Sequence, residues 1–285
     1  ESGLAAACAS VSRKELVVTH GAFEPWREGE RDADLRHAIR RLWRRAQIPS
    51  RLVCTSLNNG ALLLHYFRYD GLTEDQVRSA VRLEAEETLQ MPSQELVLDC
   101  HLIRSDGTGR RDNVCEGVLA AAPRVSVEDY CRRLQQAGIV PVILDAAPLV
   151  LANLWLWLMR DRPGEEVVFL VGLARRQAHL VQVMLDGRAF ARTIVLESGE
   201  PSAVGMNLTE NIASQQEYAE TKLGMAPARR LLVTGEGAGE ENLRSLLSRQ
   251  LSLPVEEWLP LSDPSVRCVG RARALLTDAG VARRM

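Results

Sequence analysis

Hydrophobic positions recur with two different spacings along the chain. In residues 32–46, apolar side chains such as Leu35 and Ile39 return every three or four residues, which predicts an amphipathic helix. Shorter apolar runs bounded by turn residues predict strands between the helices. We expect these strands at residues 5–9, 15–19, 51–56, 61–69, 96–103, 114–121, 139–144, 167–171, 179–185, 188–195 and 230–234. The pattern predicts a mixed α/β protein.

Polar residues mark the expected starts of several helices. Thr73 and Gln76 have the spacing of a capping box, in which each side chain satisfies a backbone N–H group of the other residue. Ser126 with Asp129 is expected to open the next helix in the same way. Asp145 is expected to be the N-cap of the helix after it. Further helices are expected at residues 202–223, 240–251 and 265–276.

The order of elements repeats once. Each half of the chain runs through strands, a helix, and then a further strand and helix. The segment Asp-Arg-Pro-Gly at residues 161–164 has the composition of a linker between the halves. A weak internal duplication is therefore predicted.

Composition and charge exclude several classes of function. The 285 residues carry a net charge of −2, which gives no global electrostatic reason to bind nucleic acid. The six cysteines include no Cys-x-x-Cys pair and the five histidines have no ligand spacing, so we expect no metal site. The apolar run at residues 140–159 contains Asp145 and two prolines, so we expect a buried strand and helix rather than a membrane span.

Three stretches carry a resemblance to a known family. The first reads VRLEAEE, then Met-Pro, then LVLD within residues 81–99. The second reads VEDY, then AGIVP, and ends in Asp within residues 127–145, and the third reads LVTGEGA, followed by a helix and LPVE, within residues 232–256. With its order of elements, the chain resembles the actin-like PilM proteins of type IV pilus assembly. It is similar also to the cytoplasmic domain of GspL-type proteins of type II secretion.

The resemblance implies a fold and a division into domains. The fold would be actin-like α/β, a duplicated RNase H-like architecture with two lobes around a nucleotide cleft. Residues 1–160 would form the first lobe, with an inserted small subdomain at about 50–123, and residues 161–285 the second. PilM-type proteins bind the short N-terminal cytoplasmic peptide of PilN, a membrane protein, and GspL-type proteins bind the secretion ATPase.

The family's first phosphate hairpin reads Asp-Ile-Gly-Ser-Ser-x-x-Lys. The matching stretch in this chain is residues 7–14, which keeps Ser10, Ser12 and Lys14 but has Ala7 at the position of Asp. Such an Asp holds the metal ion through water. The stretch is therefore interpreted as a remnant of a nucleotide site.

The other two phosphate loops are matched unequally. The second hairpin keeps Gly172 but has Leu170 at the position of Asp, whereas the third loop keeps Gly235, Gly237 and Ala238. Metal-assisted phosphoryl transfer depends on acidic anchors. We therefore expect no catalytic residues, no ATPase activity and no cofactor. The alternative is an ATP cleft that survives and binds ATP with magnesium.

The expected partner site is a groove between the inserted subdomain and the first lobe. Its residues would be Glu84, Glu87, Met91, Leu96 and Leu98. Glu84 lies in the apolar stripe of its helix, where a carboxylate must be paired. It is either a groove acid that accepts hydrogen bonds from a partner peptide or one half of an internal ion pair with an arginine.

These expectations combine into one predicted function. The chain would be a non-catalytic cytoplasmic scaffold, peripheral to the inner membrane, in a type IV pilus or type II secretion platform. Its partner would be a PilN-like inner-membrane protein; a pilus or secretion ATPase and a second copy of the chain are further candidates. Two rival functions stay open, an actin-like ATPase of the PilM or FtsA kind and a sugar kinase of the same superfamily. The chain offers no convincing catalytic Asp for the kinase.

Overall fold

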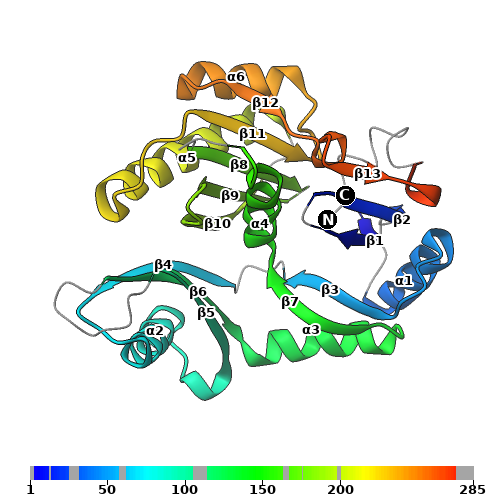
Figure 1. Cartoon of the computed structure of the whole chain (residues 1–285), viewed down its shortest axis with the longest axis horizontal. Helices are drawn as coiled ribbons and strands as arrows, with labels where there is room; N and C mark the ends of the chain where they lie inside the picture. Colours follow the sequence, from blue (N-terminus) through cyan, green and yellow to red (C-terminus); the bar gives the residue numbers. More distant parts are fainter. Residues whose placement is uncertain are drawn as a thin grey trace.

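Repeated units of strands and helices build two lobes and a small inserted subdomain (Figure 1). The computed structural model describes residues 3–12, 14–25, 32–57, 62–104, 114–162, 167–174, 176–197 and 200–273. Each lobe runs through antiparallel strands, a helix, a strand, a second helix and a further parallel strand. The two lobes follow one folding plan, and the predicted mixed α/β class is confirmed.

The second lobe contains one continuous five-stranded sheet. Its elements are β8 (Val167–Ala174), β9 (Gln177–Met184), β10 (Ala189–Val195), α5 (Pro201–Leu223), β11 (Arg230–Gly235), α6 (Glu241–Leu251) and β12 (Val255–Glu257). The strand order is β10-β9-β8-β11-β12. β9 is antiparallel to both of its neighbours, whereas β11 is parallel to β8 and β12. β8 therefore lies at the centre of the sheet.

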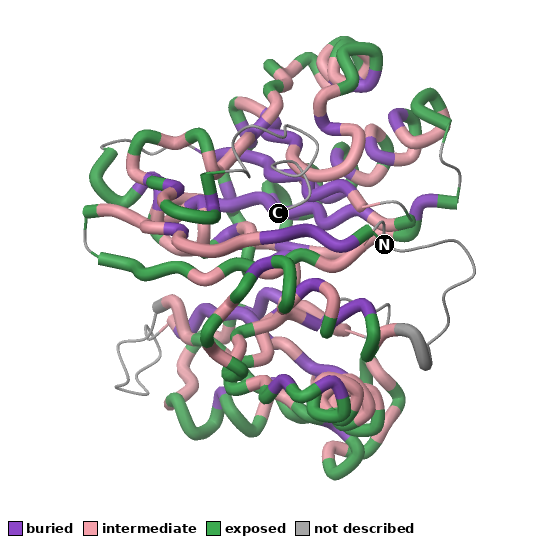
Figure 2. Tube along the Cα trace, turned by 90° about the vertical axis from the view of Figure 1, so that its right-hand side faces the viewer, coloured by how far each residue is buried: buried purple, intermediate pink, exposed green. Residues whose placement is uncertain are grey.

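Strand β8 is apolar from end to end because both faces of its sheet are covered. Successive side chains of a strand point to opposite faces. Val168 and Leu170 pack in one hydrophobic cluster with Trp155, which belongs to α4 (Ala147–Met159). Phe169 packs in a different cluster with side chains of α5 and α6. Figure 2 shows the buried residues following the strands of this sheet, while the outer helices carry the exposed ones.

The first lobe has a similar series of elements but two separate sheets. Its elements are β1 (Gly3–Val11), β2 (Leu16–Pro25), α1 (Asp32–Ala46), β3 (Leu52–Leu57), α3 (Arg124–Gln136), β7 (Val140–Ala146) and α4. β1 and β2 form an antiparallel hairpin, and β13 (Val266–Cys268) adds to β2 in parallel. β3 pairs in parallel with β7. No ladder joins β1 to β3 among the described residues.

The inserted subdomain lies between β3 and α3 in the chain. Its elements are β4 (Leu63–Asp70), α2 (Glu74–Leu89), a 3-10 turn η1 (Ser93–Glu95), β5 (Leu96–Arg104) and β6 (Val114–Pro123). The antiparallel sheet has the order β4-β6-β5. Helix α2 buries Val77, Val81 and Ala85 against one face. Tyr66 and Val118 pack in a cluster with the end of α5, so the subdomain contacts the second lobe (Figure 1).

Two predicted helix starts are wrong, although the helices themselves are present. α3 begins after Pro123, whose ring fixes an extended backbone suited to an N-cap, and Ser126 and Asp129 lie inside the helix. Ala146, rather than Asp145, is the N-cap of α4. The Asp145 carboxylate instead accepts a hydrogen bond from the Ala146 N–H group at 2.7 Å.

Other boundaries also differ from the prediction. β3 pairs with β7 and so belongs to the first lobe, which makes residues 63–123 the inserted subdomain rather than residues 50–123. The helix expected from residue 265 is instead β13 and a 3-10 turn, η3 (Gly270–Ala272), because this backbone pairs with β2. Pro163 and Gly164 of the expected linker lie outside the described residues. None of the described helices is both long and apolar enough to span a bilayer.

Candidate functional site

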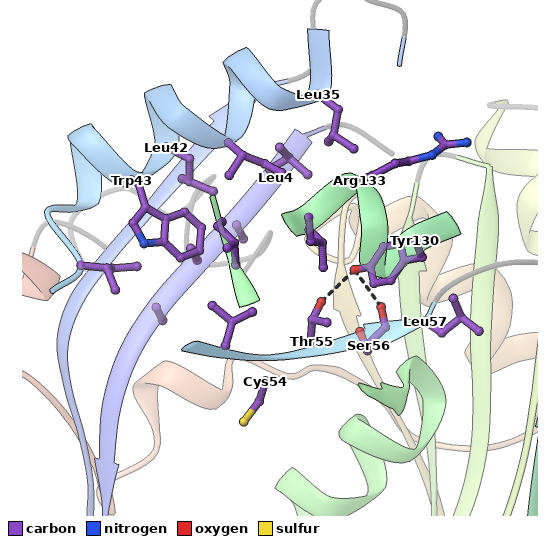
Figure 3. Close-up of a pocket in the computed structure, with 18 of the residues that line it drawn as sticks. Leu4, Leu35, Leu42, Trp43, Cys54, Thr55, Ser56, Leu57, Tyr130 and Arg133 are labelled. Atoms are coloured by element: carbon purple, nitrogen blue, oxygen red, sulfur yellow. Dashed lines mark hydrogen bonds between the residues drawn. The ribbon is translucent and has the colours of Figure 1, made fainter. Parts of the chain in front are cut away.

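A large cavity opens between strands β1 and β3 (Figure 3). Its volume is about 1590 Å³, and its walls include Leu4–Ala9 of β1 and Leu52–Leu57 of β3. Helices α1 and α3 contribute further side chains, among them Trp43 and Tyr130. We call this space the β1–β3 cavity. It exceeds the roughly 300–1,000 Å³ of typical small-molecule sites, so it has room for a segment of polypeptide.

The aromatic side chains of this wall find polar partners in the wall itself. The Tyr130 hydroxyl lies 2.8 Å from Thr55 Oγ1 and 3.4 Å from the Ser56 carbonyl oxygen (Figure 3). The Trp43 indole N–H donates to the Ser50 carbonyl oxygen at 3.0 Å. These aromatic groups are therefore already hydrogen-bonded, and they present mainly their ring surfaces to the cavity.

Charged side chains from both lobes also line the β1–β3 cavity. Asp129 and Arg133 of α3 form an ion pair with 2.6 Å between Oδ2 and Nε. Arg176 and Glu197 reach the cavity from the second lobe, at the β8–β9 turn and after β10. The cavity therefore extends from the divided first lobe to the second.

The predicted first phosphate hairpin lies apart from this cavity. Ser12 Oγ accepts hydrogen bonds from the N–H groups of Lys14 at 3.3 Å and Glu15 at 3.1 Å, which closes the turn between β1 and β2. Glu15 pairs with Arg267 of β13 at 3.1 Å. Ser10, Ser12 and Lys14 are exposed, and none of them belongs to the described lining of the cavity.

Strand order accounts for this position. β1 pairs with β2 as β9 pairs with β10, and α1 and β3 follow as α5 and β11 follow in the second lobe. β1 therefore has the position of β9, and the place equivalent to β8 is the β1–β3 cavity. The sequence analysis matched residues 7–14 to the first phosphate strand, and this strand order contradicts that match. Ala7 consequently carries no information about a magnesium anchor.

The residues of the predicted second hairpin have roles in packing. Leu170 is fully buried in the cluster beneath α4. A Cβ atom added at Gly172 would lie 2.6 Å from Leu151 Cδ1 of α4, so glycine lets this helix pack closely on β8. Gly172 thus has a packing role independent of any phosphate.

The predicted third loop is a tight turn after β11. Gly235 has φ of +95°, and a Cβ atom there would lie 2.1 Å from the Leu173 carbonyl oxygen. The Glu236 N–H donates to that oxygen at 3.0 Å, and the Ala238 N–H donates to the Gly235 oxygen at 3.3 Å. Gly237 also has positive φ, and Ala238 is fully buried. Two of the amides that would cradle a phosphate are therefore already used within the fold.

Glu84 of the predicted partner groove is paired inside the inserted subdomain. Its Oε1 lies 2.8 Å from His65 Nε2, and its Oε2 accepts a hydrogen bond from the Tyr69 hydroxyl at 2.5 Å. Burial, followed by this hydrogen bond, raises the pKa of Tyr69. The internal alternative is therefore correct, but the partners are a histidine and a tyrosine rather than an arginine. His65 and Tyr69 meet the acid because both lie on the face of β4 toward α2.

The apolar members of that groove belong to a core instead. Leu96 is 2% exposed, and Met91 and Leu98 pack against the same hydrophobic cluster beneath α2. Leu96 and Leu98 share this face because they are two residues apart on a strand. Glu87 is exposed on α2. Among the five predicted groove residues, none belongs to the described lining of the β1–β3 cavity.

A comparison with known protein families assigns the chain to one of them. The family described as type IV pilus assembly protein PilM matches residues 9–224. The chain belongs to the PilM family. No curated protein sequence matches it.

One of the similar solved structures shares the fold of this PilM-family chain closely. The structure of a PilM-PilN type IV pilus biogenesis complex is 22% identical with a TM-score of 0.80, covering 99% of this chain and 94% of that chain. A Bacteroides thetaiotaomicron protein with an actin-like ATPase fold and unknown function is 11% identical, with 95% of both chains covered and a TM-score of 0.46. The cytoplasmic domain of EpsL, an inner-membrane component of the Vibrio cholerae type II secretion system, is 11% identical, with 97% and 88% covered and a TM-score of 0.48. The family match and the likeness to the PilM-PilN structure confirm the predicted actin-like fold.

The β1–β3 cavity of this PilM-family chain is absent from the sequence prediction. Its signal is visible only in three dimensions, where an apolar strand residue of the lining remains exposed. Leu52 lines the cavity and is 61% exposed. A hydrophobic pattern predicts that a strand will be buried, but it does not say which strand edges pair. Within the described residues, no group of three His, Cys, Asp or Glu side chains is placed to hold a metal ion.

Proposed function

We propose that this chain is a non-catalytic cytoplasmic adaptor of the inner-membrane platform of a type IV pilus, and that it binds the cytoplasmic segment of a PilN-like protein. The observation that carries the proposal is the likeness of 99% of this chain, with a TM-score of 0.80, to a chain of a PilM-PilN complex. Membership of the PilM family supports the same assignment. A pilus or secretion ATPase and a second copy of the chain are further partners to test.

The second lobe supports the absence of phosphoryl transfer. Leu170 stands where the family has a metal-anchoring Asp, and its side chain is fully buried against α4. The turn after β11 carries Glu236, and Glu240 follows it at the start of α6. Carboxylates at this helix start disfavour a phosphate group electrostatically. We accordingly expect no resident cofactor.

The partner segment is proposed to bind along α2. Leu83 is 61% exposed and Glu87 is also exposed. These two residues are four positions apart, so they are neighbours on one side of the helix. An apolar side chain beside an acid suits a segment that has both an apolar anchor and a hydrogen-bond donor. Leu96 has no part in this site because it is buried.

A matched pair of charge reversals tests the site. Glu87→Arg is expected to weaken binding of a synthetic PilN-like N-terminal peptide at least tenfold in a calorimetric titration. Glu220→Arg makes the same charge change at an exposed position of α5 and is expected to leave the affinity unchanged. Equal affinity of both variants and the parent would remove α2 from the partner site, while the adaptor role itself would stand on the parent titration.

Nucleotide binding is the second candidate function, and Arg176 favours it. Arg176 is one of the residues that line the β1–β3 cavity, and its guanidinium could pair there with an anionic group. The turn at Gly235 also retains its shape before α6. Thermal unfolding with and without millimolar MgATP tests this function: a rise in the midpoint of several degrees supports it, and no change removes it.

A further inference from the structure

One helix of the first lobe presents positive charge on its outward side. From Leu35 to its end, α1 contains no acidic residue and carries the arginines Arg36, Arg40, Arg41, Arg44 and Arg45. The whole chain has a net charge of −2, so this density of positive charge is a local property of α1. The helix lies at the outer end of the first lobe, away from α6 and from the inserted subdomain (Figure 1).

The hydrophobic residues of α1 determine which of its sides faces water. Leu42 and Ala46 are buried in a cluster with Ala22 of β2 and side chains of β1. Three of the arginines are exposed on the other side of the helix: Arg36, Arg40 and Arg44. They are four residues apart, so they form one row along the helix that spans about 12 Å. We call these three residues the α1 arginine row.

The α1 arginine row takes no part in the contacts that hold the helix in place. Arg41 Nε lies 2.5 Å from Glu24 Oε1 of β2, and Arg45 donates to the Phe23 carbonyl oxygen at 3.1 Å. Among the side chains that the structure describes, no carboxylate pairs with an arginine of the row. The three guanidinium groups are therefore free to bind a ligand.

Helix stability does not explain the row either. Like charges four residues apart destabilise a helix, and in α3 the corresponding spacing is used for the ion pair of Asp129 with Arg133. The helix dipole favours positive charge in the last turn, where Arg44 lies. Arg36 and Arg40 lie in earlier turns and gain nothing from it. A row of unpaired arginines that lowers helix stability indicates a ligand of opposite charge.

Resting on the adaptor function proposed above, which places the chain beside the inner membrane, we propose that the α1 arginine row binds the anionic headgroups of a lipid bilayer. The guanidinium group suits phosphate oxygens because it can donate two parallel hydrogen bonds. A cluster of basic residues on an amphipathic helix is typical of proteins that bind anionic lipids. The apolar side of α1 packs in the core, so the contact is electrostatic and no part of the helix enters the hydrocarbon.

A nucleic acid suits the row less well than a bilayer does. Proteins that bind nucleic acids present a basic surface that follows the phosphate backbone. The residues outside α1 have a net negative charge, so a long nucleic acid would pass from this helix onto repulsive surface. A planar membrane can meet one exposed helix face at the edge of the molecule without that cost.

Co-sedimentation with lipid vesicles tests the proposal. The purified chain is mixed at low salt with vesicles of phosphatidylcholine alone, or of equal parts of phosphatidylcholine and phosphatidylglycerol. Binding is expected only to the anionic vesicles. It is expected to fall when the salt concentration is raised, because salt screens interactions between exposed charges.

A matched pair of triple variants locates the surface. Replacing the whole row (Arg36→Gln, Arg40→Gln and Arg44→Gln together) is expected to lower the partition coefficient at least tenfold. The control makes the same charge change at three exposed arginines outside α1 and is expected to stay within about twofold of the parent: Arg78, Arg229 and Arg249. Arg40→Gln alone is expected to weaken binding about threefold, which keeps the test valid if the triple variant does not fold.

Three results would overturn the proposal. They are no binding of the parent chain to anionic vesicles, equal binding of the two triple variants, and equally tight binding to a DNA duplex that is lost with the row. The adaptor role is tested separately, because the PilN-like peptide is titrated without vesicles. Saturable binding of the peptide without vesicle binding would remove only the membrane contact.

Discussion

Glu84 and Gly172 are two residues that were predicted to be functional and that make structural contacts instead. Glu84 has the position in its helix that marks a partner-binding acid, yet His65 and Tyr69 occupy both of its carboxylate oxygens. Gly172 matches a phosphate-hairpin glycine, yet the space that a Cβ atom would need at this position is filled by Leu151 of α4. The sequence shows that these residues are unusual for their positions. It does not show which neighbour the fold brings to them.

The close approach of Leu151 to Gly172 predicts a measurable coupling. Gly172→Ala is expected to lower the free energy of unfolding by about 1–3 kcal/mol, because the new methyl group would lie 2.6 Å from Leu151 Cδ1. Leu151→Ala removes the obstructing atoms. Stability is measured by denaturant unfolding. The double variant is expected to lose at least about 1 kcal/mol less than the sum of the losses in the two single variants. Strictly additive losses would show that the contact does not constrain position 172.

His179 gives the second lobe a defined pH dependence. Its ring is buried in β9, with Nδ1 2.9 Å from Thr193 Oγ1, and burial lowers its pKa from 6.5 to about 4. Between these values the unfolded chain binds the proton more readily, so stability falls as the pH falls from about 6.5 and levels off below about 4. The full loss from this group is on the order of 3 kcal/mol.

The matched variant is His179→Gln, which keeps a hydrogen-bonding side chain without a titrating group. Denaturant unfolding at pH 7.5 and 4.5 is expected to show a clearly smaller loss of stability for this variant than for the parent chain. An identical loss in both proteins would assign the acid sensitivity to other groups.

Helices and turns are the elements that the sequence predicts best, because their signals are local. The range of α1 is predicted to the residue, and the capping box of α2 is present as expected. Most strand positions are also found within a few residues, although β2 extends to Pro25, six residues beyond its expected end. Strand partners are not, because pairing depends on chain segments far apart: β3 pairs with β7, across the whole inserted subdomain. The false helix from residue 265 has the same cause, since β2 recruits that backbone as β13.

The capping box of α2 predicts a cost at one helix end. The Thr73 N–H donates to Gln76 Oε1 at 2.8 Å, and the Gln76 N–H donates to Thr73 Oγ1 at 3.4 Å. Thr73→Ala removes the side-chain acceptor and is expected to cost about 1 kcal/mol of stability in denaturant unfolding. Thr88→Ala, at an exposed position late in the same helix, is the control and is expected to change stability by less than about 0.5 kcal/mol. Equal effects would show that the box contributes nothing.

At the scale of the whole molecule, the duplication is predictable but its asymmetry is not. Repeated element order predicts two lobes, and the structure has them. The second lobe closes into one sheet around β8, whereas the first is divided at the β1–β3 cavity. An apolar pattern in β7 is the same whether or not its sheet is complete. The division is therefore visible only when the two lobes are compared in space. The same comparison shows that β1 has the position of β9, not that of the strand expected to carry the first phosphate hairpin.

The central claim is that this PilM-family chain binds a PilN-like segment as an adaptor rather than as a nucleotide-driven enzyme. One calorimetric titration tests both parts: the N-terminal cytoplasmic peptide of a PilN-like protein is titrated into the purified chain with and without MgATP. The account predicts saturable binding with one peptide per chain and the same affinity in both conditions. Binding that requires MgATP, or no binding in either condition, would contradict it.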